Sequence, residues 1–223
     1  MPQTTQRRPT TRRRRRRRKR SKAPLVLILL LILIVGIVAG RLILGGQTGS
    51  APTPPENPDW ITQDFLPRNP YSRPGTALDA VNGIVIHYVG NLGTTAAQNR
   101  SYFAGLARSG ETYASSHFLI GLEGEIIQNV PLDEVAYCSN DRNNDTLSIE
   151  CCHPDDTGEF TRETYDALVR LTRWLMEYYE LDAAQVIRHY DVTGKECPRY
   201  FVQQPEAWEL FLNELTPTDP AEE

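Results

Sequence analysis

An uncharged apolar segment close to the amino terminus restricts how this chain can be organised. Residues Ala23 to Gly40 contain no charged side chain, and most of them are Leu, Ile or Val. At a rise of 1.5 Å per residue, about 20 apolar residues in a helix cross the hydrocarbon core of a bilayer. The apolar character continues past Arg41, whose long side chain can reach toward the membrane surface. We therefore expect one transmembrane helix over residues 23–44.

The charges around this segment predict its orientation in the membrane. Residues 1–22 contain 12 of the 24 Lys and Arg residues of the chain and no acidic residue. By the positive-inside rule, this basic tail stays in the cytoplasm and the chain after residue 44 lies outside. A cleaved signal peptide is the alternative, but signal sequences have a shorter apolar core and end at a small-residue site, which Val38-Ala39-Gly40 matches poorly.

Composition excludes several classes of protein for the rest of the chain. The chain after residue 22 contains 12 basic residues and all 28 acidic residues, which gives it a net charge of −16. We therefore expect no nucleic-acid partner, and the basic tail beside an apolar span suits anionic lipid better. Hydrophobic residues make up 40% of the chain, with ten Tyr and three Trp, which excludes a wholly disordered protein. Four Cys residues are too few for a scaffold built on disulfides.

Two segments have the composition of connections. Residues 45–80 begin Gly-rich and continue Pro-rich, which predicts a flexible and then extended linker. Trp60, Phe65 and Tyr71 lie within it, and we expect them to pack as an irregular arm on the following domain. The tail over residues 216–223 is expected to be disordered.

Residues 81–215 alternate between patterns typical of buried strands and of amphipathic helices. The β-branched run from Gly83 to Val89 predicts a buried strand, and Thr161 begins a long helix with apolar residues every three to four positions. These patterns predict one α/β domain, a sheet with helices packed on it. The expected strands are 83–89, 117–121, 125–130, 147–152 and 186–190, and the expected helices are 94–110, 161–178 and 206–215.

Three residues with metal-binding side chains lie in or after the expected strands. His87 and His189 fall in buried strands, and Cys197 follows His189 by eight positions through a turn containing Gly194. Imidazole and thiolate suit Zn²⁺, and three protein ligands with one open position is the arrangement of catalytic zinc sites. A single histidine in a protein core is more often a hydrogen-bonded structural residue, so the pattern rests on the three residues together.

Two charged residues accompany this pattern. Glu150 lies in the otherwise apolar strand 147–152, where burial would raise the pKa of its carboxyl toward the range useful to a general base. The alternative is an edge-strand residue that faces water. Lys195, the only Lys after residue 22, lies two residues from Cys197, and its ammonium is suited to stabilising an oxyanion. A solvated loop residue is the alternative for Lys195.

In this order, the residues resemble the N-acetylmuramoyl-L-alanine amidase type 2 family, which includes phage lysozyme-type amidases and peptidoglycan recognition proteins. The resemblance covers residues 81–215 and implies a single central mixed β-sheet flanked by helices. It rests on the strand with His87, the hairpin from Ser115 to Gly124, the strand from Leu147 to Glu150, and the segment from Arg188 to Pro198.

The resemblance also implies an activity and a set of site residues. His87, His189 and Cys197 would bind one Zn²⁺, Glu150 would be the catalytic base and Lys195 would stabilise the oxyanion. The substrate would be peptidoglycan, cut at the amide bond between N-acetylmuramic acid and the L-alanine of the stem peptide. With the predicted topology, this single-pass protein would hold its catalytic domain on the cell-wall side of a bacterial cell membrane.

Substrate contacts are less clearly implied. The resemblance places His117 in the substrate cleft, with Ser116 beside it, and a structural role that orients a neighbouring group stays open for His117. Several relatives carry Tyr at the position of Ser116, so that role is either absent here or taken by Glu150.

Two other functions stay open on the sequence alone. A peptidoglycan-binding module without catalysis would share the fold, although in recognition proteins loss of the Cys ligand accompanies loss of activity, and Cys197 is present. A Cys-His hydrolase with a thiol nucleophile would be sensitive to alkylation and indifferent to chelators. Cys138, Cys151 and Cys152 are expected to be free thiols, with a disulfide between Cys138 and one of the other two as the alternative.

Overall fold

The computed structural model describes residues 55–216. The predicted transmembrane helix over residues 23–44, the basic tail before it, the first part of the linker and residues 217–223 lie outside the described residues. Among residues 55–216, no helix is both long enough and apolar enough to cross a bilayer. The membrane-spanning helix therefore stays a prediction.

One six-stranded sheet organises the described residues, with the strand order β1-β4-β3-β5-β2-β6. Strands β3 and β4 form an antiparallel hairpin, and every other neighbouring pair is parallel. The expected mixed sheet is thus confirmed. The strands are β1 (Ile61–Gln63), β2 (Ile84–Tyr88), β3 (Phe118–Ile120), β4 (Ile126–Gln128), β5 (Leu147–Cys151) and β6 (Val186–Arg188).

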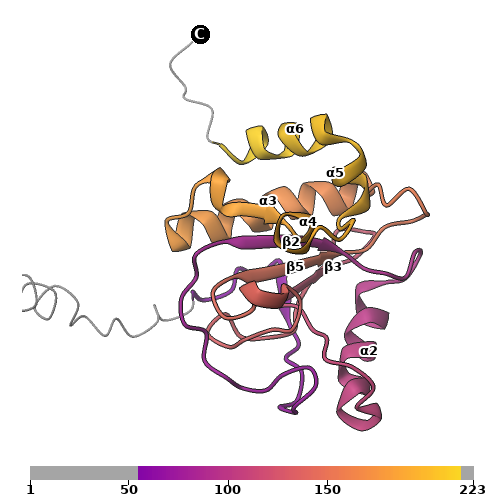
Figure 1. The fold of residues 1–223 in the computed structure, drawn as a ribbon, viewed down its shortest axis with the longest axis vertical. Coiled ribbons are helices and arrows are strands. Elements are labelled where there is room, and N and C mark those ends of the chain that lie inside the picture. The colour runs from indigo at the N-terminus through magenta and orange to yellow at the C-terminus, as the bar shows by residue number, and fades with distance from the viewer. Residues whose placement is uncertain (1–54, 217–223) are drawn as a thin grey trace, which may run out of the picture. The chain divides into compact units, whose positions relative to one another are not determined.

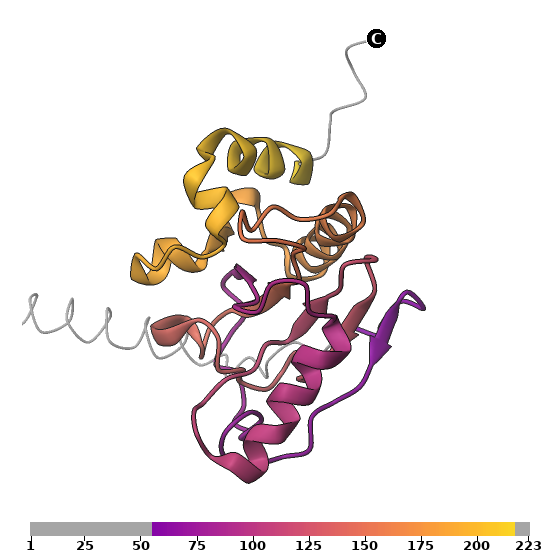
Figure 2. The same ribbon diagram turned by 90° about the vertical axis from the view of Figure 1, so that its right-hand side faces the viewer.

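Helices cover both faces of this sheet. Helices α3 (Arg162–Tyr179) and α6 (Pro205–Leu215) lie on one face, and α2 (Ala96–Ser109) lies on the other (Figures 1 and 2). Short helices occupy the connections: η1 (Asn140–Arg142), η2 (Ala183–Gln185), α4 (His189–Thr193) and α5 (Arg199–Gln203).

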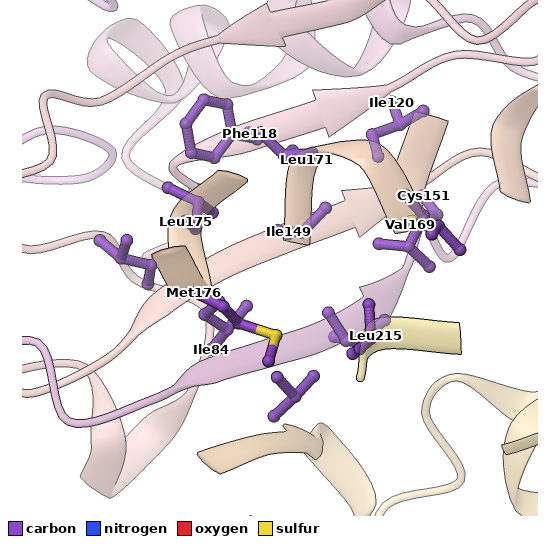
Figure 3. Close-up of a cluster of buried hydrophobic side chains, with 14 of the residues drawn as sticks. Ile84, Phe118, Ile120, Ile149, Cys151, Val169, Leu171, Leu175, Met176 and Leu215 are labelled. Atoms are coloured by element: carbon purple, nitrogen blue, oxygen red, sulfur yellow. The ribbon is translucent and has the colours of Figure 1, made fainter. Parts of the chain in front are cut away.

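The larger core lies between the sheet and helix α3. Ile84, Phe118 and Ile149 point from the strands toward Leu171 and Leu175 of α3, and all five are fully buried (Figure 3). The apolar residues of α3 recur at helical spacing, so they form one stripe along the helix, and this stripe is buried against the sheet. A second cluster, which includes Phe103 and Leu106 of α2, covers the opposite face. Side chains of alternate strand residues therefore face two different environments.

Two local expectations are wrong. The sequence places His189 in a strand, but β6 ends at Arg188 and helix α4 begins at His189. The side chain of Asp191 explains this change, because its Oδ2 accepts the backbone N–H of Arg188 (2.8 Å) and caps the helix. In α2, Thr95 rather than Thr94 is the cap residue.

The arm before the predicted domain is part of the sheet. Strand β1 pairs in parallel with β4, so the arm is not entirely irregular. Glu134, whose side chain is only 9% exposed, holds the arm farther along. Its carboxylate accepts hydrogen bonds from Arg73 Nε (2.7 Å) and from Arg68 Nη2 (2.8 Å). The hydrogen bonds from Arg73, and then those from Arg68, keep the pKa of Glu134 below its ordinary value despite burial.

This ion-pair network should make the free energy of unfolding decrease as the pH falls into the acid range. Because the pKa of Glu134 is lower in the folded state, its stabilisation is complete above the unfolded pKa of about 4.3 and is lost as pH falls through the folded pKa. We expect Glu134→Gln to lower the free energy of unfolding at pH 7 by about 1.5–3 kcal/mol, the usual value of hydrogen bonds to charged groups. Urea unfolding should show this difference shrinking toward pH 3. The exposed Glu209→Gln is the matched control, and an equal difference at both pH values would contradict the assignment.

Candidate metal centre and active site

The centre of the sheet places a histidine beside a carboxylate. His87 in β2 and Glu150 in β5 are direct partners in the parallel ladder between these strands. Their neighbours Ile86 and Ile149 belong to the core under α3. Since successive side chains of a strand point to opposite faces, His87 and Glu150 share the face away from that core.

The segment after β6 brings two further residues to this face. His189 is the first residue of α4, and Gly194 ends that helix in the left-handed conformation (φ 75°), which glycine adopts without strain. The chain then turns back, and the backbone N–H of Tyr190 donates to the carbonyl of Cys197 (2.9 Å). The predicted spacing of eight residues is thus spanned by one short helix and its turn.

His87, His189 and Cys197 come together as predicted. Their potential ligand atoms all lie within 4.8 Å of one another, and the three side chains are buried. The Sγ atom of Cys197 lies 3.9 Å from Nδ1 of His87, and the two imidazole rings are 4.6 Å apart between centroids. Among residues 55–216, a second group with the same spacing shares His87 and adds Cys138 and Glu150.

The electrostatics of the three residues fit a metal cation. Burial, and then the nearby His189 and Lys195, hold the pKa of His87 well below its ordinary value. Burial and Lys195 also lower the pKa of His189, so both rings are neutral and keep a lone pair for a metal. Burial raises the pKa of the Cys197 thiol to about 12, so a cation must be close for the thiolate to form. This donor set suits zinc.

The Glu150 carboxyl group lies beside this group of donors. Its Oε1 accepts a hydrogen bond from the thiol of Cys138 (3.4 Å), whereas Oε2 is buried and has no partner among the described residues. Burial raises the pKa of Glu150 to about 7, although the Cys138 hydrogen bond and the charge of Lys195 oppose the rise. The edge-strand alternative does not hold, because β5 lies between β3 and β2.

Lys195 lies on the exposed turn between α4 and Cys197. Burial has the largest effect on the pKa values of His87, His189 and Glu150, and the positive charge of Lys195 is a smaller effect that favours the neutral rings and the ionised carboxylate. No ion pair of Lys195 is found within residues 55–216. The charge is therefore available to a bound anion.

Ser116 and His117 are not brought into this group. His117 is 1% exposed, its Nδ1 accepts the backbone N–H of Ser148 (3.0 Å), and its Nε2 donates to the carbonyl of Glu134 (2.9 Å). Ser116 is fully buried and donates to the carbonyl of Phe118. The expected substrate contacts are not supported, because both side chains are buried and hydrogen-bonded within the protein. The structural role for His117 fits this geometry.

Cys138, Cys151 and Cys152 are free thiols, as expected, and Cys197 also forms no disulfide. The alternative disulfide from Cys138 to Cys151 or Cys152 is absent from the described structure. Ser139 and Asn140, whose side chains contact the two histidines, were not predicted from the sequence. Their only signal is a run of polar turn residues directly after Cys138.

Fold and site together define an α/β protein with a buried candidate metal centre of two histidines and one cysteine. The chain belongs to the N-acetylmuramoyl-L-alanine amidase family Amidase_2, whose profile matches residues 77–200. The family resemblance seen in the sequence is thus confirmed.

Curated relatives agree with this family. A probable N-acetylmuramoyl-L-alanine amidase of Bacillus licheniformis is 36% identical over 155 residues, which cover 64% of this chain and 43% of the relative. The N-acetylmuramoyl-L-alanine amidase CwlL of the same species is 34% identical over 168 residues, which cover 70% of this chain and 46% of CwlL. The chain thus spans less than half the length of these two relatives.

Solved structures share the fold. The catalytic domain of XlyA matches with a TM-score of 0.59 and 29% identity, over 70% of this chain and 99% of that domain. PlyL matches with a TM-score of 0.61, over 71% of this chain and 98% of PlyL. At 19% identity, the likeness to PlyL concerns the fold alone.

Proposed function

We propose that this protein is a zinc-dependent N-acetylmuramoyl-L-alanine amidase. It hydrolyses the amide bond that joins the lactyl group of N-acetylmuramic acid in peptidoglycan to the L-alanine of the stem peptide. The observation that carries this proposal is the buried group of His87, His189 and Cys197 beside the unpaired carboxylate oxygen of Glu150. Family membership supports the choice of bond.

The two histidines and Cys197 would hold one zinc ion. When bound, zinc supplies Lewis-acid polarisation of the scissile carbonyl and favours ionisation of water near neutral pH. Three protein donors would leave one position for substrate, as in catalytic zinc sites.

Glu150 and Lys195 would carry the proton transfer and the charge. The buried Oε2 of Glu150 is the base that takes a proton from the attacking water and returns it to the leaving amine of L-alanine. A pKa near 7 suits a group that must both accept and release a proton at neutral pH. The ammonium of Lys195 stabilises the negative charge that develops on the carbonyl oxygen.

Product analysis with the full-length chain, kept in detergent throughout, tests the activity. Muropeptides should yield free muramyl lactate and a new amino terminus on L-alanine. Cleavage should stop when a chelator removes the metal and return when Zn²⁺ is added. Binding of muropeptides without cleavage would instead support a recognition module. Cleavage that ignores the chelator and stops on alkylation would support a thiol nucleophile.

We also propose a location for this activity. Because residues 23–44 have the length and composition of a membrane span and the basic residues precede it, the amino terminus would stay in the cytoplasm. The amidase domain would then lie on the cell-wall side of a bacterial cell membrane, where its substrate is. Protease accessibility of the domain in intact spheroplasts tests this topology.

A further inference from the structure

Three consecutive residues contact the candidate active site from one turn. We call residues 138–140 the site-facing turn. Each of its three side chains contacts one residue of the candidate site. The pairs are Cys138 Sγ with Glu150 Oε1 (3.4 Å), Ser139 Oγ with His87 Nε2 (3.1 Å), and Asn140 Oδ1 with His189 Nε2 (2.8 Å).

The conformation of the site-facing turn is fixed by the protein itself. The side-chain oxygen of Asn143 accepts the backbone N–H groups of Cys138 (3.0 Å) and Ser139 (2.6 Å). The backbone N–H of Asn143 donates to the carbonyl of Asn140 (3.1 Å). Asn140 itself is in the left-handed conformation (φ 52°), which Asn tolerates better than most residues other than glycine. These hydrogen bonds therefore fix the positions from which the three side chains of the turn contact the site.

The contact with Asn140 determines which nitrogen of His189 carries the proton. An amide oxygen only accepts hydrogen bonds, so Nε2 of His189 must be the protonated nitrogen. The lone pair of the ring then lies on Nδ1. For His87, the Ser139 hydroxyl beside Nε2 can accept the ring proton and fixes the orientation of the ring, which leaves Nδ1 facing Cys197.

We propose that Ser139 and Asn140 are positioning residues that hold His87 and His189 in the ring orientation and tautomer needed to bind zinc. This inference rests on the proposed zinc-dependent function. Groups that bind the outer nitrogen of a metal-ligating histidine typically contribute 10–100-fold to metal affinity. We expect a loss of this size when Asn140 loses its side-chain oxygen.

Zinc affinity of the full-length chain, measured by competition with a chromophoric chelator, tests this proposal. Asn140→Gly removes the acceptor but keeps a residue that favours the left-handed backbone. The matched control is Glu180→Gly, since Glu180 is the other non-glycine residue with positive φ in the described structure (φ 54°) and ends helix α3. Asn140→Asp restores an acceptor at the same place, and thermal unfolding of each metal-free variant shows whether it is folded.

The proposal predicts about 10–100-fold weaker zinc binding for Asn140→Gly, wild-type binding for Glu180→Gly, and recovery in Asn140→Asp. A folded Asn140→Gly variant with wild-type zinc affinity would overturn it, and so would equal losses in both glycine variants. If the first variant does not fold, Ser139→Ala with the buried Ser72→Ala as control replaces it, with the same criteria. A wild-type chain that binds no zinc would overturn both the function and this inference, whereas zinc binding without cleavage would overturn only the function.

Discussion

Replacing Cys197 with Ser should reduce amidase activity to the background rate and weaken zinc binding more than 100-fold. Cys197 is 2% exposed, and its Sγ lies 3.9 Å from Nδ1 of His87. Neither water nor another side chain can easily take the place of this thiol. Groups that only hydrogen-bond to a metal ligand contribute about 10–100-fold to metal affinity. Loss of a direct ligand should therefore cost more than that. Chelator competition and muropeptide turnover measure the two effects.

Cys152→Ser is the matched control for this variant. Cys152 is fully buried like Cys197, but it belongs to neither group of potential metal donors, and its sulfur accepts a hydrogen bond from Asn99 (3.6 Å) that a hydroxyl can also accept. It should keep its zinc and its activity. A Cys197→Ser protein with wild-type zinc affinity would remove Cys197 from the ligand set.

Glu150→Gln should lower kcat by about 10²–10⁴-fold while zinc still binds, because a positioned general base contributes that much to proton transfer. Gln has nearly the shape of Glu and retains a carbonyl oxygen, so the thiol of Cys138 keeps an acceptor. KM should change little, since the carboxylate acts on the attacking water and not on the bound sugar or peptide. Steady-state kinetics with a soluble muropeptide separate kcat from KM.

The exposed Glu177→Gln on helix α3 controls for the loss of one negative charge. It should match the wild type in both kcat and zinc affinity. If Glu150→Gln keeps its turnover, Glu150 is not the base. If it loses zinc together with turnover, Glu150 belongs to the metal donors, as its place in the second group with His87 and Cys138 would allow.

Strongly patterned elements were predictable from sequence, and short ones were not. Strand β2 and helix α3 end within one residue of their expected limits, because their apolar spacing matches the burial that the structure gives them. Strand β1 has three residues in a Pro-rich arm, too few to show an alternating pattern. Its pairing with β4 depends on residues more than 60 positions away, which no local pattern reports.

Some residues of the candidate site were also predictable from the sequence, and others were not. His87 and Glu150 were predictable because their residue types are uncommon in buried strands, and Cys197 because a thiol eight residues after His189 suits a metal site. The roles of Ser139 and Asn140 were not, because such residues are common in turns and their contacts cross 52 and 49 positions of sequence. For His117 the sequence leaves two roles open, and the hydrogen bonds that its ring makes within the protein favour the structural one.

Strand β1 also determines where the sheet stops. The family profile begins at residue 77, so a fragment cut there would lack β1 and leave the outer backbone groups of β4 without their partners. An unpaired strand edge is a template for joining a second chain. With β1 present, that edge is covered and the new outer strand is only three residues long. We therefore expect the arm to reduce edge-to-edge association between copies of the chain, an effect separate from catalysis.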